Sequence, residues 1–335
     1  MTAERDPVVS VIVVRSGQAG ELRRCLQALL DTGYPALELI VVVDAADDAA
    51  AGMAASFASV MRVQSPASLD VAGATNLGLA HATGEYVALV AQDTVVAPDW
   101  VRELVRFLEI HPDAAAAGGK AHGWSNQHPV GDGRNPYSSY ATIDPATCFA
   151  RTWHDTPDEV REVATLSACA IMLRRRAIDE VGPVFLEPEF TTCYQETDLF
   201  ARLLVRGWRL YYTGTPAAWH RDADPDPGRQ RRDLFHVHRN RALFAYRNLG
   251  PEGLRALLRR RRDQDLIDRL RVRLAPFLPA NPQVEARREA QRWIDEHLEL
   301  LERHRAGAEH TRDERWAAAV RLAQAGGASA GTRAS

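Results

Sequence analysis

Short apolar runs that alternate with helical patterns constrain the fold of this chain more than any other feature. Each run consists mostly of apolar residues, many of them β-branched, which is typical of a strand buried on both faces. The clearest runs are Val8–Val14, Leu37–Val43 and Glu85–Ala91, and helical patterns lie at Glu21–Leu30, Ala45–Ser59 and Ala72–Ala82. Strands that alternate with helices predict an α/β fold with a mostly parallel sheet flanked by helices.

The rest of the chain changes character twice. Residues 118–147 are rich in Gly, Asn, Pro, Ser and aromatic residues, so we predict an irregular segment there that is either functional or mobile. Strands at Thr165–Leu173 and Trp208–Thr213 and a helix at Glu196–Arg206 follow. From Gln230 the pattern is helical. We therefore predict an α/β domain over residues 1–229, a helical extension over 230–325 and a disordered tail over 326–335.

Composition restricts the partners and the compartment. The formal net charge is -3, which favours no nucleic acid partner. The polar start of the chain does not resemble a secretory signal, and no apolar run reaches the roughly 20 residues that span a bilayer. The four cysteines are scattered, as in reduced proteins. We expect a cytoplasmic protein, from a bacterium on the basis of its Arg- and Ala-rich composition.

The run Arg259–Arg262 has two interpretations. It lies in a helical pattern with Leu254, Leu257 and Leu258, and it could grip an anionic membrane surface or a phosphate-bearing lipid. We favour a solvated charged face, because acidic residues are mixed with the arginines further along the chain. Peripheral membrane contact stays open, as does a homodimer formed by the C-terminal helices.

Acidic residues gather where an α/β protein has its binding site. Asp44 and Asp93 each follow a buried strand, and ligands of open α/β sheets bind beyond the carboxyl ends of the strands. Either residue alone is more simply a turn or helix-capping residue, but two at equivalent places favour a site. Glu196 and Asp198 open a predicted helix, where they either stabilise its N-terminus or supply a general base. His220 follows the last strand and could supplement a metal site.

The order and spacing of these segments resemble the inverting GT-A glycosyltransferases of family 2. The resemblance covers roughly residues 8–249. The segments that carry it are Val9–Val13, Glu38–Asp44, Gly73–Leu79, Gln92–Val96, Ser167–Arg175, Glu196–Leu199, His220 and His238–Arg241. The region around Gln92 and Asp93 is most similar to the variant of the DxD motif found in rhamnosyltransferase-like members. Ala91 stands where the family usually has the first Asp of that motif.

The resemblance implies a catalytic GT-A domain over residues 1–229. Its donor part covers about 8–117 and its acceptor part about 118–229. It also implies transfer of a hexosyl or pentosyl group from a nucleoside-diphosphate sugar to a hydroxyl of an envelope glycan, glycolipid or natural product. A UDP- or dTDP-sugar is favoured over a GDP-sugar.

The resemblance also gives roles to single residues. Glu196 becomes the catalytic base, and Asp198 orients it or binds the acceptor. Asp93 and His220 become ligands of Mg²⁺ or Mn²⁺. The residues expected to bind the donor are Val14, Ser16, Asp44, Asn76, Gln92, Asp93 and Arg239. Trp124, Trp153 and Tyr137 lie in or near the irregular segment and could either stack on a sugar or anchor that segment.

Two other functions remain compatible with the sequence. Ala91 favours a catalytically degenerate protein that binds a nucleotide sugar without transferring it. A nucleotidyltransferase also uses an α/β sheet and a divalent metal, but it needs an early Gly-rich basic loop that grips phosphate. Arg15-Ser16-Gly17 resembles such a loop only weakly, because it offers one Arg and one Gly.

Overall fold

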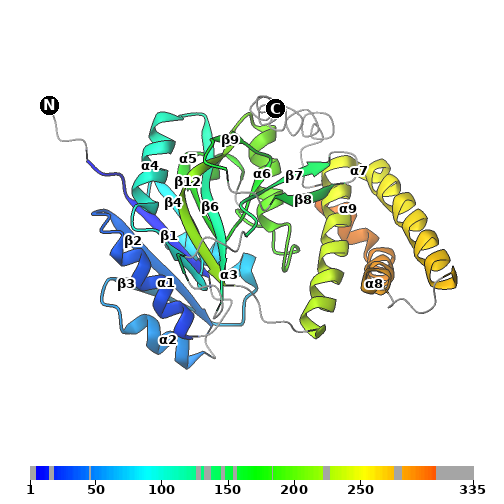
Figure 1. Cartoon of the computed structure of the whole chain (residues 1–335), viewed down its shortest axis with the longest axis horizontal. Coiled ribbons are helices and arrows are strands. Elements are labelled where there is room, and N and C mark those ends of the chain that lie inside the picture. Colours follow the sequence, from blue (N-terminus) through cyan, green and yellow to red (C-terminus); the bar gives the residue numbers. More distant parts are fainter. Residues whose placement is uncertain are drawn as a thin grey trace.

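A large central sheet, covered by helices on both faces, forms the body of the protein in this computed structural model (Figure 1). The structure describes residues 5–14, 19–44, 47–125, 130–131, 137–144, 148–153, 157–182, 184–221, 227–274 and 281–306. The strands are β1 (Val9–Val14), β2 (Leu37–Asp44), β3 (Val60–Ser65), β4 (Tyr86–Ala91), β5 (Thr94–Val96), β6 (Ala114–Trp124), β7 (Tyr140–Asp144), β8 (Phe149–Trp153), β9 (Arg161–Glu162), β10 (Thr165–Leu166), β11 (Ala170–Arg174) and β12 (Arg209–Arg221). The helices are α1 (Ala19–Asp31), α2 (Asp48–Ala55), α3 (Val71–His81), α4 (Trp100–Ile110), α5 (Arg175–Glu180), α6 (Gln195–Val205), α7 (Pro227–Leu274), α8 (Pro282–Glu296) and α9 (Leu298–Ala306).

The central sheet has the order β3-β2-β1-β4-β11-β6-β12-β5, with β9 beside β12. The strands β1 to β4 are mutually parallel, as are β6 and β12. The strands β11, β5 and β9 pair antiparallel to their neighbours. A small second sheet joins β10, β7 and β8. The predicted α/β fold, with a mostly parallel sheet flanked by helices and a helical C-terminal region, is confirmed.

The central strands β1 and β4 are almost entirely apolar and buried because both faces of the sheet are covered there. In β1, Val9, Val11 and Val13 pack into one core, whereas Ile12 and Val14 pack into the other. Successive side chains of a strand point to opposite faces, so burial on both sides removes any alternation of polar and apolar residues. The helices α1, α2 and α4 contribute to the first core, and α3, α5, α6 and α7 contribute to the second.

The segment predicted to be irregular contains regular structure, so that prediction was wrong in part. The strand β6 runs through Gly118 and Gly119 to Trp124, and β7 follows at Tyr140. The small residues let β6 lie close to β12, because a Cβ atom on Gly119 would lie only 1.8 Å from the Pro216 carbonyl oxygen. Pairing with β12, which a sequence pattern does not reveal, therefore extends this strand.

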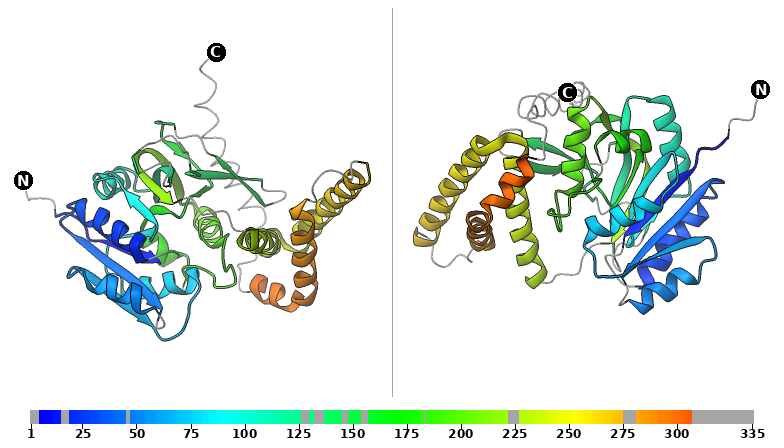
Figure 2. Two further views of the ribbon diagram at one scale, coloured as in Figure 1. Left: turned by 60° about the horizontal axis from the view of Figure 1, so that its bottom comes forward. Right: turned by 180° about the vertical axis from the view of Figure 1, so that it is seen from behind.

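The helical C-terminal region lies at the end of the molecule away from β3 (Figures 1 and 2). Its first helix, α7, is interrupted at Gly250, which has a φ of 71° and precedes Pro251. The single helix predicted over 283–305 is divided at His297 into α8 and α9. The side chain of Asn281 caps α8, because its Oδ1 atom accepts a hydrogen bond from the backbone N–H of Gln283 at 3.0 Å. The helix predicted at 315–325 lies outside the described residues.

Candidate functional site

A cavity of about 340 Å³ opens at the carboxyl ends of β1 and β4. Val14 is the last residue of β1, and Ala91 is the last residue of β4. Ligands of α/β sheets bind beyond this edge, so the cavity lies where the topology places a site. Its lining is Val14, Val71, Thr75, Leu89, Val90, Ala91, Tyr137, Ser167, Ala168, Cys169, Thr192, Cys193, Tyr194, Glu196 and His220.

Three residues predicted from the sequence meet around this cavity. Val14 comes from β1, Glu196 from the first turn of α6, and His220 from the end of β12. These residues are far apart in the chain, and the sheet and the helix α6 bring them to one place.

Asp93 and His220 are in direct contact at the cavity, where His220 belongs to the lining and Asp93 does not. The antiparallel pairing of β5 with β12 places His220 opposite Thr94, and the Arg221 amide donates to the Asp93 carbonyl at 3.0 Å. As a result, the His220 Nε2 atom lies 3.2 Å from the Asp93 Oδ1 atom. The Tyr137 ring stacks on the His220 ring with a centroid distance of 4.6 Å. Tyr137 therefore lies at the cavity, whereas Trp124 is buried and donates its indole N–H to the Asp93 carbonyl at 3.1 Å.

Glu196 lies at the start of α6 behind a strained residue. The residue before the helix, Tyr194, has a φ of 72°, which is unfavourable for a bulky side chain. Its hydroxyl donates to the Cys148 carbonyl at 2.9 Å, which holds it in place. Such strain is found most often at functional sites. Burial raises the pKa of the Glu196 carboxyl above its ordinary value. A raised pKa makes the ionised carboxylate a stronger base.

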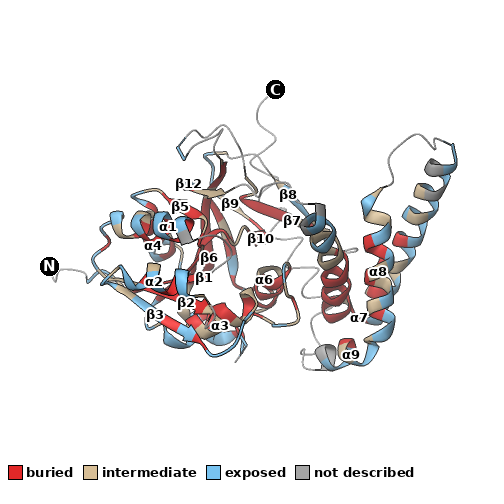
Figure 3. Cartoon of the chain, turned by 90° about the horizontal axis from the view of Figure 1, so that it is seen from below, coloured by how far each residue is buried: buried red, intermediate tan, exposed pale blue. Residues whose placement is uncertain are grey.

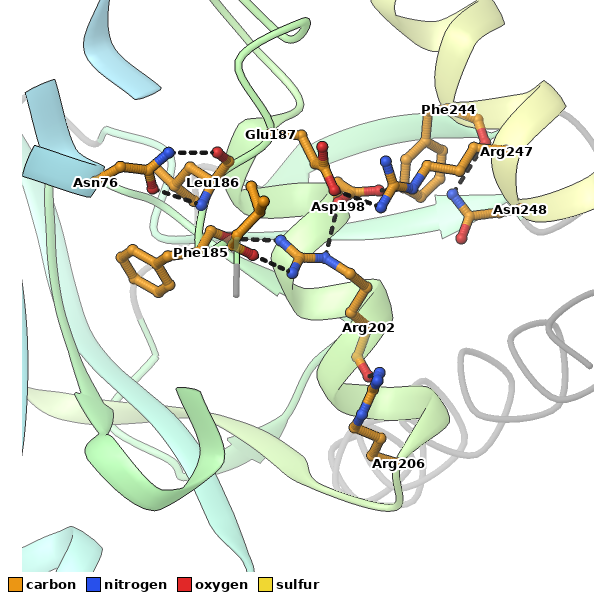
Figure 4. A network of polar contacts seen from close by, with 11 residues as sticks. Asn76, Phe185, Leu186, Glu187, Asp198, Arg202, Arg206, Phe244, Arg247 and Asn248 are labelled. Carbon is orange, nitrogen blue, oxygen red and sulfur yellow. Dashed lines mark hydrogen bonds and ion pairs between the residues drawn. The ribbon is translucent and has the colours of Figure 1, made fainter. Parts of the chain in front are cut away.

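Asp198 has a structural environment that the sequence did not reveal. It is fully buried, and its two oxygens lie 2.9 Å from Arg202 Nε and 3.1 Å from Arg247 Nε. Arg202 also donates to the Val184 carbonyl at 2.8 Å and to the Phe185 carbonyl, and Arg247 pairs with Glu187 at 2.6 Å (Figure 4). The network joins α6, α7 and the segment 184–187, which leads toward Glu196.

Asn76 holds the same segment from the opposite side. Its amide nitrogen donates to the Leu186 carbonyl at 2.7 Å, and its amide oxygen accepts from the Leu186 N–H at 2.8 Å (Figure 4). Both polar groups of Asn76 are thus occupied by backbone. This contact supports the loop before α6, and Asn76 does not line the cavity.

The other predicted donor-binding residues lie outside the cavity lining. Asp44 ends β2, and Gln92 is buried just after β4. Arg239 is buried on α7, where its guanidinium stacks on Trp293 at 4.2 Å and donates to Asn240 Oδ1 at 2.9 Å. Burial lowers the pKa of Arg239. Ser16 lies outside the described residues.

Several cavity residues escaped the sequence analysis. Thr192, Cys193 and Tyr194 belong to an irregular segment that has no period or motif, so no pattern marked them. The side chain of Asn240 on α7 holds this segment at the cavity by donating a hydrogen bond to the Cys193 carbonyl at 2.8 Å. Ser167 and Cys169 precede β11, a strand that the sequence did single out.

A family model places the chain among known proteins. The model described as Glycosyl transferase family 2 matches residues 10–182, slightly more than half of the chain. The chain belongs to glycosyl transferase family 2. The chain thus carries the domain of enzymes that transfer sugars, and the matched residues contain nearly all of β1, the whole of β4 and β11, and most of the cavity lining.

Sequence relatives agree with the family. Glycosyltransferase GlyA of Streptococcus pneumoniae is 23% identical over 185 residues, which are 52% of this chain and 26% of that protein. The uncharacterized protein y4gI of Sinorhizobium fredii is 24% identical over 259 residues, which are 70% of this chain and 28% of that protein. The chain thus spans little more than a quarter of the length of these relatives.

Solved structures share the fold. The mannosyltransferase PcManGT of Pyrobaculum calidifontis, in complex with GDP-Man and Mn²⁺, matches with a TM-score of 0.50 and 17% identity over 95% of this chain and 87% of its own. Residues 1–349 of S. aureus TarS, in complex with UDP-GlcNAc, match with a TM-score of 0.54 and 15% identity over 95% and 92% of the two chains. At such low identity these likenesses support the fold alone.

The described residues contain neither a cluster of metal-binding side chains nor a helix suited to span a membrane. No group of three or more His, Cys, Asp or Glu side chains in this part of the chain is arranged to hold a metal ion. Within the same residues, no helix combines the length and the apolar character needed to cross a membrane.

Proposed function

We propose that this family 2 protein transfers a hexosyl or pentosyl group from a nucleoside-diphosphate sugar to an acceptor hydroxyl, with inversion at the anomeric carbon. One observation carries the proposal. Glu196, a carboxylate with a raised pKa, lines the cavity at the carboxyl ends of β1 and β4 together with His220. A base of this kind, next to a cavity at the binding edge of the sheet, suits attack by a hydroxyl group on a bound sugar.

Glu196 is the proton acceptor in the proposed reaction. The acceptor oxygen forms its bond to the anomeric carbon as the bond from that carbon to the diphosphate oxygen breaks. The hydroxyl proton moves to a Glu196 carboxylate oxygen, and the nucleoside diphosphate leaves on the opposite face of the sugar. A single displacement of this kind inverts the configuration. Asp198 contributes indirectly, because its ion pairs with Arg202 and Arg247 position the segment that leads to Glu196.

Asp93 and His220 are the proposed metal ligands. A carboxylate and an imidazole in contact at 3.2 Å fit a divalent cation, and the imidazole favours Mn²⁺ over Mg²⁺. When bound, the cation would neutralise charge on the leaving diphosphate. Since no third His, Cys, Asp or Glu side chain of the described residues joins this pair, we propose that oxygen atoms of the donor and of water would complete the coordination.

The proposal also covers the donor class and the compartment. We keep a UDP- or dTDP-sugar as the proposed donor class, bound by Val14, Asp44 and the Gln92–Asp93 segment. PcManGT and TarS were solved with GDP-Man and UDP-GlcNAc respectively, so both nucleotide classes belong in a binding test. A cytoplasmic location is supported by cysteines that are all free thiols. The rhamnosyltransferase-like DxD variant and the acceptor classes stay predictions.

A Glu196→Gln variant tests the proposed base. We expect release of nucleoside diphosphate from donor plus acceptor to fall at least ~100-fold, because general base catalysis contributes about that much or more. Donor binding, measured by calorimetric titration, should be retained. The matched control is Glu103→Gln, which changes a carboxylate in the first turn of α4 away from the cavity. Near-normal turnover in Glu196→Gln would remove Glu196 from the mechanism.

A catalytically degenerate binder is the second candidate function. Ala91 lines the cavity in place of a carboxylate, which favours this alternative. Thermal-shift measurements against UDP-, dTDP- and GDP-sugars with Mn²⁺, Mg²⁺ or EDTA, followed by assay of released nucleoside diphosphate, separate the two functions. A transferase binds and releases the diphosphate when acceptor is added. A degenerate protein binds the donor and releases none with any acceptor class tried.

A further inference from the structure

The second half of α7 carries an exposed aliphatic stripe. Leu266, Ile267, Leu270 and Leu274 are 57%, 64%, 48% and 81% exposed. They recur at helical spacing and so share one side of the helix. Elsewhere the large exposed aliphatic residues of the described chain are scattered, and four of them in two helical turns form a contiguous apolar surface.

The opposite side of the same helix is already packed. Leu254, Leu257 and Arg261 are buried there, and Asp265 pairs with Arg287 of α8 at 2.7 Å. The stripe therefore faces away from α8, and most of the second half of α7 is coloured as exposed in Figure 3. The packing of the helical region uses one side of α7 and leaves the aliphatic side uncovered.

Positive charge surrounds the stripe. Residues 255–274 contain eight arginines and three aspartates, in a chain whose formal net charge is -3. Arg259 and Arg262 are exposed and lie about two turns and one turn before Leu266. Arg273 is also exposed, between Leu270 and Leu274. An apolar stripe flanked by arginines is the pattern of helices that lie in the headgroup region of anionic membranes.

A basic groove lies between α7 and α8, and its lining includes Arg262, which lies one turn before Leu266 of the stripe. Its volume is about 370 Å³, and five arginines and two aspartates line it together with Leu258 and Gln291. The arginines are Arg261, Arg262, Arg287, Arg288 and Arg292.

Buried charge increases the positive field of this groove. Arg261 is 4% exposed, and its Nε and Nη1 atoms have no hydrogen-bond acceptor among the described residues. Burial, together with like charge from Arg241, lowers the pKa of Arg261 to about 9, so Arg261 is still charged at neutral pH. A nearby anion would reduce the free-energy cost of this buried charge. The groove is therefore suited to a phosphate group.

From these observations we infer that the outer side of α7 docks on the surface of an anionic phospholipid bilayer, with the aliphatic stripe among the headgroups and the basic groove holding a lipid phosphate. The inference does not rest on the proposed function. It adds a partner at a surface separate from the cavity, and a lipid bilayer is the occupant that both the apolar stripe and the surrounding arginines fit.

Vesicle flotation with the full chain tests this surface. We expect binding to vesicles of phosphatidylcholine mixed with phosphatidylglycerol, weaker binding at high salt, and little binding to phosphatidylcholine alone. The triple variant Leu266→Ser, Ile267→Ser, Leu270→Ser should bind at least about tenfold more weakly. The matched control is Ile110→Ser on α4, at a residue that is 63% exposed, and it should bind normally. All substituted side chains are exposed, so unchanged melting temperatures will verify folding.

Charge variants test the basic side of the same surface. Arg259→Gln with Arg262→Gln should weaken binding to the mixed vesicles about fivefold for each arginine removed. The control pair Arg62→Gln with Arg106→Gln removes two exposed arginines from β3 and α4 and should have no such effect.

Several outcomes would overturn the inference. One is equal vesicle binding by the variants and their controls, and another is no vesicle binding at all. A third is a wild-type protein that binds inorganic phosphate but not vesicles, with phosphate binding lost in the double variant Arg288→Gln, Arg292→Gln. That result would assign the groove to a free phosphate. A fourth is a dimer that the serine variants convert to a monomer in sedimentation, since that assigns the stripe to a second copy.

Discussion

Removing the Asp198 carboxylate should destabilise the protein by about 3–5 kcal/mol, the usual cost of breaking a buried ion pair. Asp198 is fully buried, and its partners Arg202 and Arg247 have side chains that are only 2% and 6% exposed. In Asp198→Ala, Arg247 keeps its contact with Glu187, but Arg202 keeps only carbonyl partners. A buried guanidinium without a counter-charge is the main source of the loss.

The expected change is large enough to measure by calorimetry or urea unfolding. With an unfolding entropy of about 2.1 cal/mol/K per residue, a loss of about 3–5 kcal/mol lowers the melting temperature of 335 residues by about 4–7 °C. Asp198→Asn should lose less, because the amide oxygen still accepts a hydrogen bond.

An exposed ion pair provides the control for this prediction. Asp113 lies 3.3 Å from Arg209 Nε, and both side chains are about half exposed. Asp113→Ala should therefore cost only about 0–1 kcal/mol. If Asp198→Ala lowered the free energy of unfolding no more than Asp113→Ala, the buried network of Figure 4 would not be a main source of stability.

Three further predictions concern the cavity and the sheet. The pKa of Glu196 is raised in the folded state, so its contribution to stability is fully present at low pH and is lost as the pH rises through the folded-state pKa. Glu196→Gln should therefore be more stable than the wild type at neutral pH and equally stable in acid. Sugar transfer should show the opposite trend and fall as the pH is lowered and the base is protonated. Gly119→Ala should cost several kcal/mol in urea unfolding, because the new methyl group meets the Pro216 carbonyl and neither backbone can yield; an undisturbed variant would contradict the close strand pairing. Asn76→Ala should lower the free energy of unfolding by about 2–4 kcal/mol, because it leaves the N–H and C=O of buried Leu186 unpaired. In the double variant with Asp198→Ala the two losses should not add, since both residues hold one segment. Strict additivity would show that the two contacts are independent.

The sequence by itself determined the sheet and the edge where the site lies. Nearly continuous runs of β-branched apolar residues such as Val8–Val14 indicate strands buried on both faces, because burial of both faces removes the alternation of polar and apolar residues. The end of such a strand marks the binding edge of the sheet. The positions of Val14, Glu196 and His220 around one cavity follow from that rule and from the order of the family's motifs.

Only the tertiary structure decided the roles of residues whose partners are distant in the chain. Asp198 looks like a helix N-terminal carboxylate in the sequence, but the burial of Arg202 and Arg247 beside it makes it part of an ion-pair network. Gly118 and Gly119 look like a loop, but pairing with β12 makes them a strand. Local patterns report on neighbours three or four residues away, whereas burial, strain at Tyr194 and long-range pairing depend on the whole packed molecule.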